Sequence, residues 1–88
     1  MPGAQIDLLI DRNDQTINLC EIKFGASTYE LTKKDAADIE NKKRVFRHHT
    51  GTRKHLFVTL ITTMGVVNNA HKINGVDQVV TLEDLFGG

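Results

Sequence analysis

The chain runs QIDLLIDRNDQTINLCEIKF from Gln5 to Phe24, and this stretch decides the fold. Apolar and β-branched residues dominate Gln5–Asp11 and Thr16–Phe24, which predicts two strands. Between them, residues 12–15 have the polar composition of a turn. Two strands joined by so short a loop form an antiparallel hairpin, so we expect the chain to begin its sheet there.

Three charged side chains interrupt these apolar strands. Asp7 lies in the first strand, and Glu21 and Lys23 lie in the second. Because side chains alternate across a strand, Glu21 and Lys23 share one face. Whether Asp7 joins them depends on the register of the hairpin.

Opposed residues of an antiparallel hairpin have a constant sum of sequence numbers. A three-residue loop gives a sum of 28, which places Asp7 opposite Glu21. A two-residue loop would place Asp7 opposite Cys20 or Ile22, whose side chains leave by the other face. The even register therefore predicts two carboxylates side by side, with Cβ atoms about 4.5–5.5 Å apart.

Two carboxylates at that spacing repel each other unless a proton or a cation lies between them. Mg²⁺ or Mn²⁺ meets this need, because a hard divalent cation takes oxygen ligands. Lys23, beside the pair, supplies an ammonium that can stabilise charge developing on a phosphate. Asp7, Glu21 and Lys23 together predict metal-assisted hydrolysis of a phosphodiester. The alternative for the same residues is a surface hairpin with a cross-strand ion pair.

The rest of the chain predicts a mixed sheet of about four strands, which makes the fold class α/β. A helix from Thr32, with Asp35 in the reciprocal capping position, is expected to cross over between strands. We expect this helix to end near His49. The elements expected after it are a strand at His55–Thr63, a loop at Gly65–Gly75, a strand at Gln78–Leu82 and a helical turn at Glu83–Phe86.

The 88 residues allow one domain, 1–88, and the formal net charge is zero. No apolar run approaches the roughly 20 residues that span a membrane, and Cys20 is the only cysteine. We therefore expect a cytoplasmic protein without a membrane partner.

Residues 42–55 carry positive charges and no acid. They favour contact with nucleic-acid phosphates, and the alternative is a solvated helix end that complements the helix dipole. Three nearby histidines also suggest zinc, but adjacent histidines diverge on a helix and no cysteine lies close in sequence. The basic residues are Lys42, Lys43, Arg44, Arg47, Arg53 and Lys54.

Asp7 in its hairpin, followed by Cys20-Glu21-Ile22-Lys23, resembles the PD-(D/E)XK phosphodiesterase motif. The resemblance implies a restriction-endonuclease-like core in which Asp7, Glu21 and the Ile22 carbonyl bind Mg²⁺ or Mn²⁺ and Lys23 is catalytic. Nearly the whole chain, including Leu56–Thr63 and Leu82–Phe86, also resembles the C-terminal domain of AAA-type bacterial and archaeal ATPases.

The resembled core begins with a helix, whereas the first strand here begins close to Met1, and no Walker-type phosphate loop is present. We therefore expect a truncated domain lacking that helix and the ATPase portion. The first hypothesis is a DNA endonuclease-like domain, incomplete as this fragment. The second is a non-catalytic assembly module of an ATPase. Either would associate with the missing portion or form a homo-oligomer through exposed sheet surface.

Overall fold

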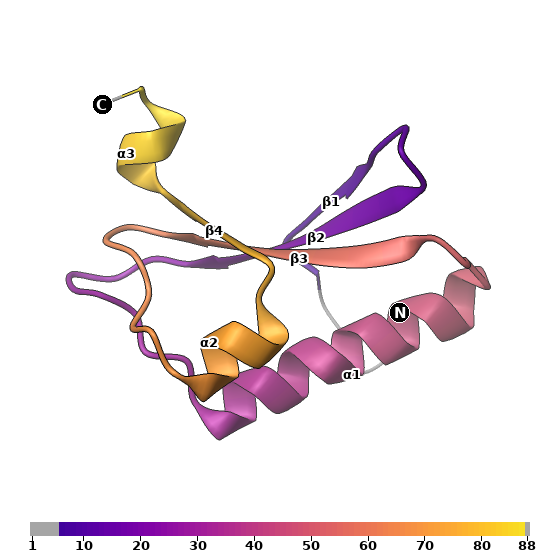
Figure 1. The fold of residues 1–88 in the computed structure, drawn as a ribbon, viewed down its shortest axis with the longest axis horizontal. Coiled ribbons are helices and arrows are strands. Elements are labelled where there is room, and N and C mark those ends of the chain that lie inside the picture. Colours follow the sequence, from indigo (N-terminus) through magenta and orange to yellow (C-terminus); the bar gives the residue numbers. More distant parts are fainter. Residues whose placement is uncertain (1–5, 88) are drawn as a thin grey trace.

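The computed structural model describes residues 6–87, which form an α/β fold around one four-stranded sheet (Figure 1). The strand order is β1-β2-β3-β4; the first pair is antiparallel and the other two pairs are parallel. The expected α/β class and mixed sheet are confirmed. The elements are β1 (Leu8–Asp11), β2 (Thr16–Lys23), α1 (Lys33–Thr50), β3 (His55–Thr62), α2 (Ala70–Gly75), β4 (Gln78–Thr81) and α3 (Leu82–Leu85).

The hairpin of β1 and β2 has the register that a three-residue loop predicts. Leu8 pairs with Cys20, so opposed residue numbers sum to 28. The Arg12 N–H donates to the Thr16 carbonyl at 2.9 Å and closes the turn. Gln15 has a φ of 63°, the left-handed conformation that commonly ends such a loop. The even register is therefore confirmed along β1.

Helix α1 connects β2 to β3, as parallel pairing of these strands requires. The Thr32 hydroxyl accepts the Asp35 N–H at 3.1 Å, and the Asp35 carboxylate accepts the Thr32 N–H at 3.0 Å. This is the predicted capping box. At the other end Gly51 has a φ of 65° and donates its N–H to the Arg47 carbonyl at 2.8 Å. Both ends of the helix are thus fixed by hydrogen bonds.

The segment Gly65–Gly75 is not only a loop, as the sequence suggested, because it contains α2. The Asn69 side chain caps this helix by accepting the Lys72 N–H at 3.0 Å. Tyr29 and Val66, just before the helix, form an isolated parallel bridge. None of the six residues of α2 is buried, so the sequence has no apolar stripe that would have predicted the helix.

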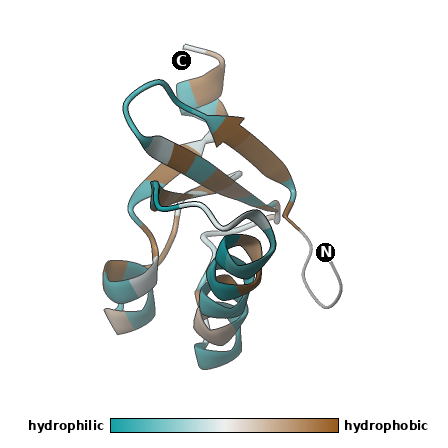
Figure 2. Cartoon of the chain, turned by 90° about the vertical axis from the view of Figure 1, so that its right-hand side faces the viewer, coloured by the Kyte–Doolittle hydropathy of each residue, from teal (hydrophilic) through white to brown (hydrophobic). Residues whose placement is uncertain are grey.

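Both α1 and α2 lie on the same side of the sheet (Figures 1 and 2). The strands are the most hydrophobic elements, as Figure 2 shows. Alternate residues of β2 and β3 point towards the helices, and β2 continues this row with Glu21 and Lys23. The buried apolar core therefore lies between the sheet and α1; it consists of Ile17, Leu19, Leu31, Ile39, Phe46, Leu56, Val58 and Leu60.

The opposite face of the sheet is more open. Among residues 6–87, only α3 lies on that side, beyond the end of β4 (Figure 1). Leu8 and Ile10 in the edge strand β1 and Ile22 in β2 are exposed there.

No helix within the described part of the chain is long and apolar enough to cross a membrane.

Candidate functional site

Asp7 directly precedes β1, where its side chain continues the pairing with β2. Its Oδ2 accepts the Ile22 N–H at 2.9 Å. Extending the register of the hairpin by one residue places Asp7 opposite Glu21. The Asp7 carboxylate is close enough to raise the pKa of Glu21. The structure thus brings these two acids together across the hairpin.

Glu21 is a buried acid on the face of β2 that α1 covers, with only 5% of its surface exposed. The Lys42 Nζ, from α1, lies 2.7 Å from its Oε1. Burial raises the pKa of Glu21; the hydrogen bond and charge of Lys42 lower it, and the charge of Asp7 raises it again. The balance leaves this pKa above its ordinary value, because one ammonium offsets burial only in part.

Lys23 is half-buried on the same face of β2 and lies near Asp35 at the start of α1. Burial would raise the pKa of Asp35, but hydrogen bonds from Thr32 and from the Tyr29 hydroxyl lower it, and so does the charge of Lys23. The pKa of Asp35 is therefore below its ordinary value. Lys23 has two acids within its surroundings, Glu21 on its own strand and Asp35 on the helix.

A small pocket between the sheet and α1 joins these groups. Its volume is about 10 Å³, room for about one water molecule. Its lining combines buried apolar side chains with charged ones, so these charges interact more strongly than they would in open water. The lining residues are Glu21, Lys23, Leu31, Asp35, Asp38, Ile39, Lys42 and Leu60.

Ile22 contributes its backbone at this site, while its side chain is exposed on the open face of the sheet. Its N–H donates to the Asp7 carboxylate on the side of β2 that faces β1. The strand β1 begins only after Asp7, at Leu8. In a strand, the N–H and C=O of one residue leave on the same side. The Ile22 carbonyl therefore faces the same edge as the Asp7 carboxylate.

The oxygen atoms at this edge suit one small hard cation. Within residues 6–87, no three His, Cys, Asp or Glu side chains gather where one ion could reach them all. Asp7 and Glu21 offer two carboxylates, and the Ile22 carbonyl is the third protein oxygen. Mg²⁺ is often held by one or two carboxylates and keeps several waters, so this donor set fits it. His48 and His49 form an edge-to-face ring pair instead, at the exposed end of α1.

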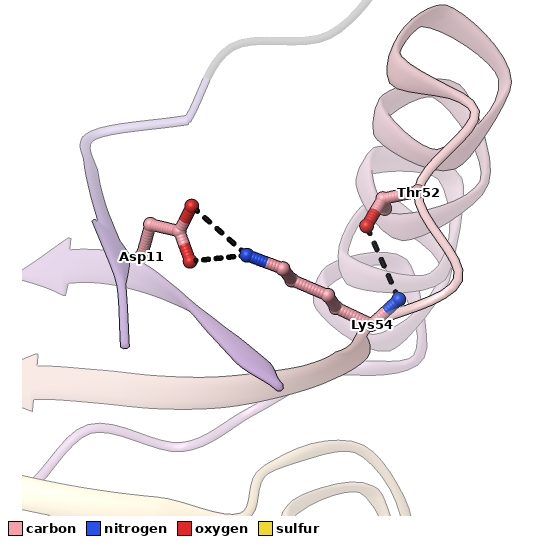
Figure 3. Close-up of polar contacts among 3 residues, drawn as sticks. All are labelled: Asp11, Thr52 and Lys54. Carbon is pink, nitrogen blue, oxygen red and sulfur yellow. Dashed lines mark hydrogen bonds and ion pairs between the residues drawn. The ribbon is translucent and has the colours of Figure 1, made fainter. Parts of the chain in front are cut away.

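The basic residues proposed for nucleic-acid contact are not equivalent. Lys42 points inward to Glu21. Lys54 lies beside the hairpin, where its Nζ is 2.9 Å from Asp11 Oδ1 and its backbone N–H donates to the Thr52 hydroxyl at 3.1 Å (Figure 3). Arg47 donates to the carbonyls of Thr52 and Lys54 and so holds the chain after α1. These three therefore have structural partners.

Of the other three basic residues, one is half-buried and two are exposed. The Lys43 Nζ is 3.8 Å from Glu40 Oε1, one turn away on α1. Arg44 donates to the Asn41 side chain, and Arg53 is exposed. Arg44 and Arg53 are thus exposed members of the basic segment, and Lys43 pairs with an acid on its own helix.

The sequence assigned Lys42 to nucleic-acid contact, whereas the structure pairs it with Glu21. Its position was predictable from spacing, because it follows Ile39 by three residues and precedes Phe46 by four. Ile39 and Phe46 are the buried residues of α1, so Lys42 lies on the stripe that faces the sheet. The run of positive charges around it concealed that signal.

Comparison of the chain with protein-family models, with curated proteins and with solved structures finds no match. Function is therefore inferred from the geometry and chemistry of the site.

Proposed function

We propose that this chain is a PD-(D/E)XK-type nuclease domain that hydrolyses DNA phosphodiesters with Mg²⁺ or Mn²⁺, as part of a larger ATPase. The observation that carries the proposal is the meeting of Asp7 with the buried Glu21 across the hairpin, in the register with a sum of 28. Lys23 lies on the same face of β2 and lines the adjoining pocket.

Asp7, Glu21 and the Ile22 carbonyl would hold the cation. Burial of Glu21 beside a second carboxylate makes its negative charge costly, and Lys42 offsets this cost only in part, which favours binding of a further cation. When bound, the cation supplies Lewis acidity to the phosphodiester and to the attacking water.

Lys23 would contribute an ammonium beside the scissile phosphate. Its half-buried position keeps it near Glu21, and the charge of Asp35 attracts it towards the pocket. An ammonium in such a partly dry site stabilises negative charge that develops in the transition state more than it would in water. This placement supports for Lys23 the role that the motif gives to its lysine.

The order of elements also supports a restriction-endonuclease-like core. A hairpin carries the acids and the lysine, α1 crosses over, and β3 pairs in parallel with β2. The crossover places one face of α1 over the acids, so the site lies where a helix and the end of a hairpin meet. Such an arrangement allows one edge to stay open to a large polyanion.

A calorimetric titration with Mn²⁺ tests the metal site. Asp7→Asn removes a carboxylate charge with little change in size, and we expect at least about a tenfold loss of affinity. Asp14→Asn is the matched control, because Asp14 pairs with Arg12 at 2.7 Å in the exposed turn. Equal Mn²⁺ binding by wild type, Asp7→Asn and Asp14→Asn, or binding by none of them, would rule out the proposed metal site.

A plasmid cleavage assay with Mg²⁺, run on the longer parent protein that carries this domain, then tests the reaction. Lys23→Met should abolish cutting, whereas Lys33→Met, at an exposed lysine in the first turn of α1, should leave it unchanged. Cutting that survives Lys23→Met would contradict the proposed role of this lysine. Cutting by no protein in the series, together with normal Mn²⁺ binding, would leave the metal site and remove the nuclease activity.

The open face of the sheet favours a second candidate function, an assembly module that dimerises through this surface. Leu8, Ile10 and Ile22 expose apolar surface there, and β1 is a free sheet edge in the described chain. Light scattering over a range of concentrations would detect a dimer. Ile10→Lys should abolish it, and Ile73→Lys, at an exposed site on α2, should not. A monomer at every concentration would count against this function.

A further inference from the structure

The buried Glu21 carboxylate already has a cationic partner within the chain. The Lys42 Nζ lies 2.7 Å from Glu21 Oε1, a charge-assisted hydrogen bond as well as an ion pair. Only 6% of the Glu21 side chain and 19% of the Lys42 side chain are exposed. The ammonium therefore already pairs with one of the two oxygens that a cation bound to Glu21 would use.

The backbone of α1 keeps this ammonium in place. Ile39 and Phe46 anchor the helix in the core on either side of Lys42. The Thr32 cap and the left-handed Gly51 fix its two ends. Lys42 cannot move away with the helix, so only rotation of its own side chain can free Glu21.

A second acceptor lies within reach of such a rotation. Asp38 precedes Lys42 by four residues on the same helix and lines the same pocket. An acid four residues before a lysine is the favourable orientation for a helical pair. The pocket thus offers the ammonium two carboxylates, Glu21 on the sheet and Asp38 on the helix.

We propose that Lys42 is a tethered counter-ion that competes with the divalent cation for Glu21 and turns towards Asp38 when the cation binds. The proposal rests on the proposed function, because it takes Asp7 and Glu21 as the metal ligands. Lys42 is on this view a positioning residue that sets metal affinity. It offsets part of the negative charge of the acid pair while no metal is bound, and it weakens binding of the metal when the metal arrives.

Titration with Mn²⁺ alone, at one pH and ionic strength, tests this without any measurement of activity. Lys42→Met removes the competitor, and we expect Mn²⁺ to bind at least about tenfold more tightly than to wild type. Lys42→Arg should weaken Mn²⁺ binding, because a guanidinium can hold both oxygens of a carboxylate. Lys43→Met, which removes the adjacent lysine paired with Glu40, should leave the affinity unchanged.

Asp38→Asn removes the second acceptor. We expect it to weaken Mn²⁺ binding about twofold, the size of one helical ion pair. Unchanged affinity in this variant would overturn the turn towards Asp38.

The outcomes distinguish a failure of the proposed Lys42 competition from a failure of the proposed metal site. If wild type binds Mn²⁺ and Lys42→Met binds it equally or more weakly, Lys42 does not compete with the cation. The metal site itself is then still supported. Binding by no variant overturns both. If Lys42→Met does not fold, Lys42→Arg decides, because affinity equal to or above that of wild type contradicts the competition. A purely structural role for Lys42 could lower affinity on mutation but would not raise it.

Discussion

Two ion pairs join the hairpin to the α1 side of the molecule, and they differ in almost everything except length. Glu21 and Lys42 are 2.7 Å apart with side chains 6% and 19% exposed. Asp11 and Lys54 are 2.9 Å apart with side chains 61% and 33% exposed. Exposed pairs contribute little to stability, whereas removing one partner of a buried pair leaves a charge without solvent or partner. Distance alone therefore does not tell which pair matters.

The largest expected effect is that of Lys42→Met without metal. It leaves the buried Glu21 carboxylate unpaired beside Asp7, and we expect the free energy of unfolding to fall by about 2–3 kcal/mol. Urea unfolding followed by circular dichroism measures this. Lys43→Met, at the more exposed neighbour, should cost no more than about 0.5 kcal/mol. Equal losses in the two variants would contradict the importance of burial.

Removing both charges of the buried pair should be less harmful than removing one. In the double variant Glu21→Gln with Lys42→Met no ionic group of the pair is left in the pocket, so we expect recovery of about 1 kcal/mol relative to Lys42→Met. A double-mutant cycle from the same unfolding curves gives the coupling between the two residues. A double variant less stable than Lys42→Met would show that the two side chains act independently of their charges.

The pH dependence of stability offers a third comparison. Burial raises the pKa of Glu21 above its ordinary value of 4.5; the Lys42 ammonium lowers this pKa in part, and the Asp7 carboxylate raises it further. The native state then binds more protons than the unfolded chain, so this contribution is complete below pH 4.5 and is lost as pH rises through the native pKa of Glu21. Unfolding curves on both sides of pH 4.5 should show a smaller decline in Glu21→Gln than in wild type. Glu83→Gln, at an exposed acid, should retain the wild-type decline.

The smallest expected effect belongs to the exposed pair. Lys54→Met should lower the free energy of unfolding by less than about 1 kcal/mol, and added salt should remove the difference from wild type. Thermal melts at low and high salt would measure it. A loss as large as that of Lys42→Met would mean that Lys54 also holds the chain after α1 through contacts other than its charge.

The sequence predicted those features that depend on local spacing. The loop of three residues and the alternation along β2 determine the hairpin register, and Thr32 with Asp35 determines the start of α1. The juxtaposition of Asp7 with Glu21 follows from that register. Helix α2 could not be predicted, because it buries none of its residues and depends on the Asn69 cap.

Lys42 shows what local spacing leaves out. Its charge resembles that of its neighbours Lys43 and Arg44, and only the packing of Ile39 and Phe46 decides that it points to the sheet. A pattern of charge along a sequence gives the sign of each side chain but not the direction in which that side chain points. The direction comes from tertiary packing, which also decides which of the six basic residues make contacts within the fold.

The strand pairings also imply an order of events in folding. A hairpin such as that of β1 and β2 closes in about 1–10 μs, whereas parallel pairing of β2 with β3 waits for the whole crossover through α1. Asp7 and Glu21 therefore meet before Lys42 reaches them. Because the ammonium arrives late, we expect Lys42→Met to speed unfolding and leave the folding rate nearly unchanged in stopped-flow measurements. The hairpin thus brings two like charges together first, and the helix supplies a positive partner for one of them afterwards.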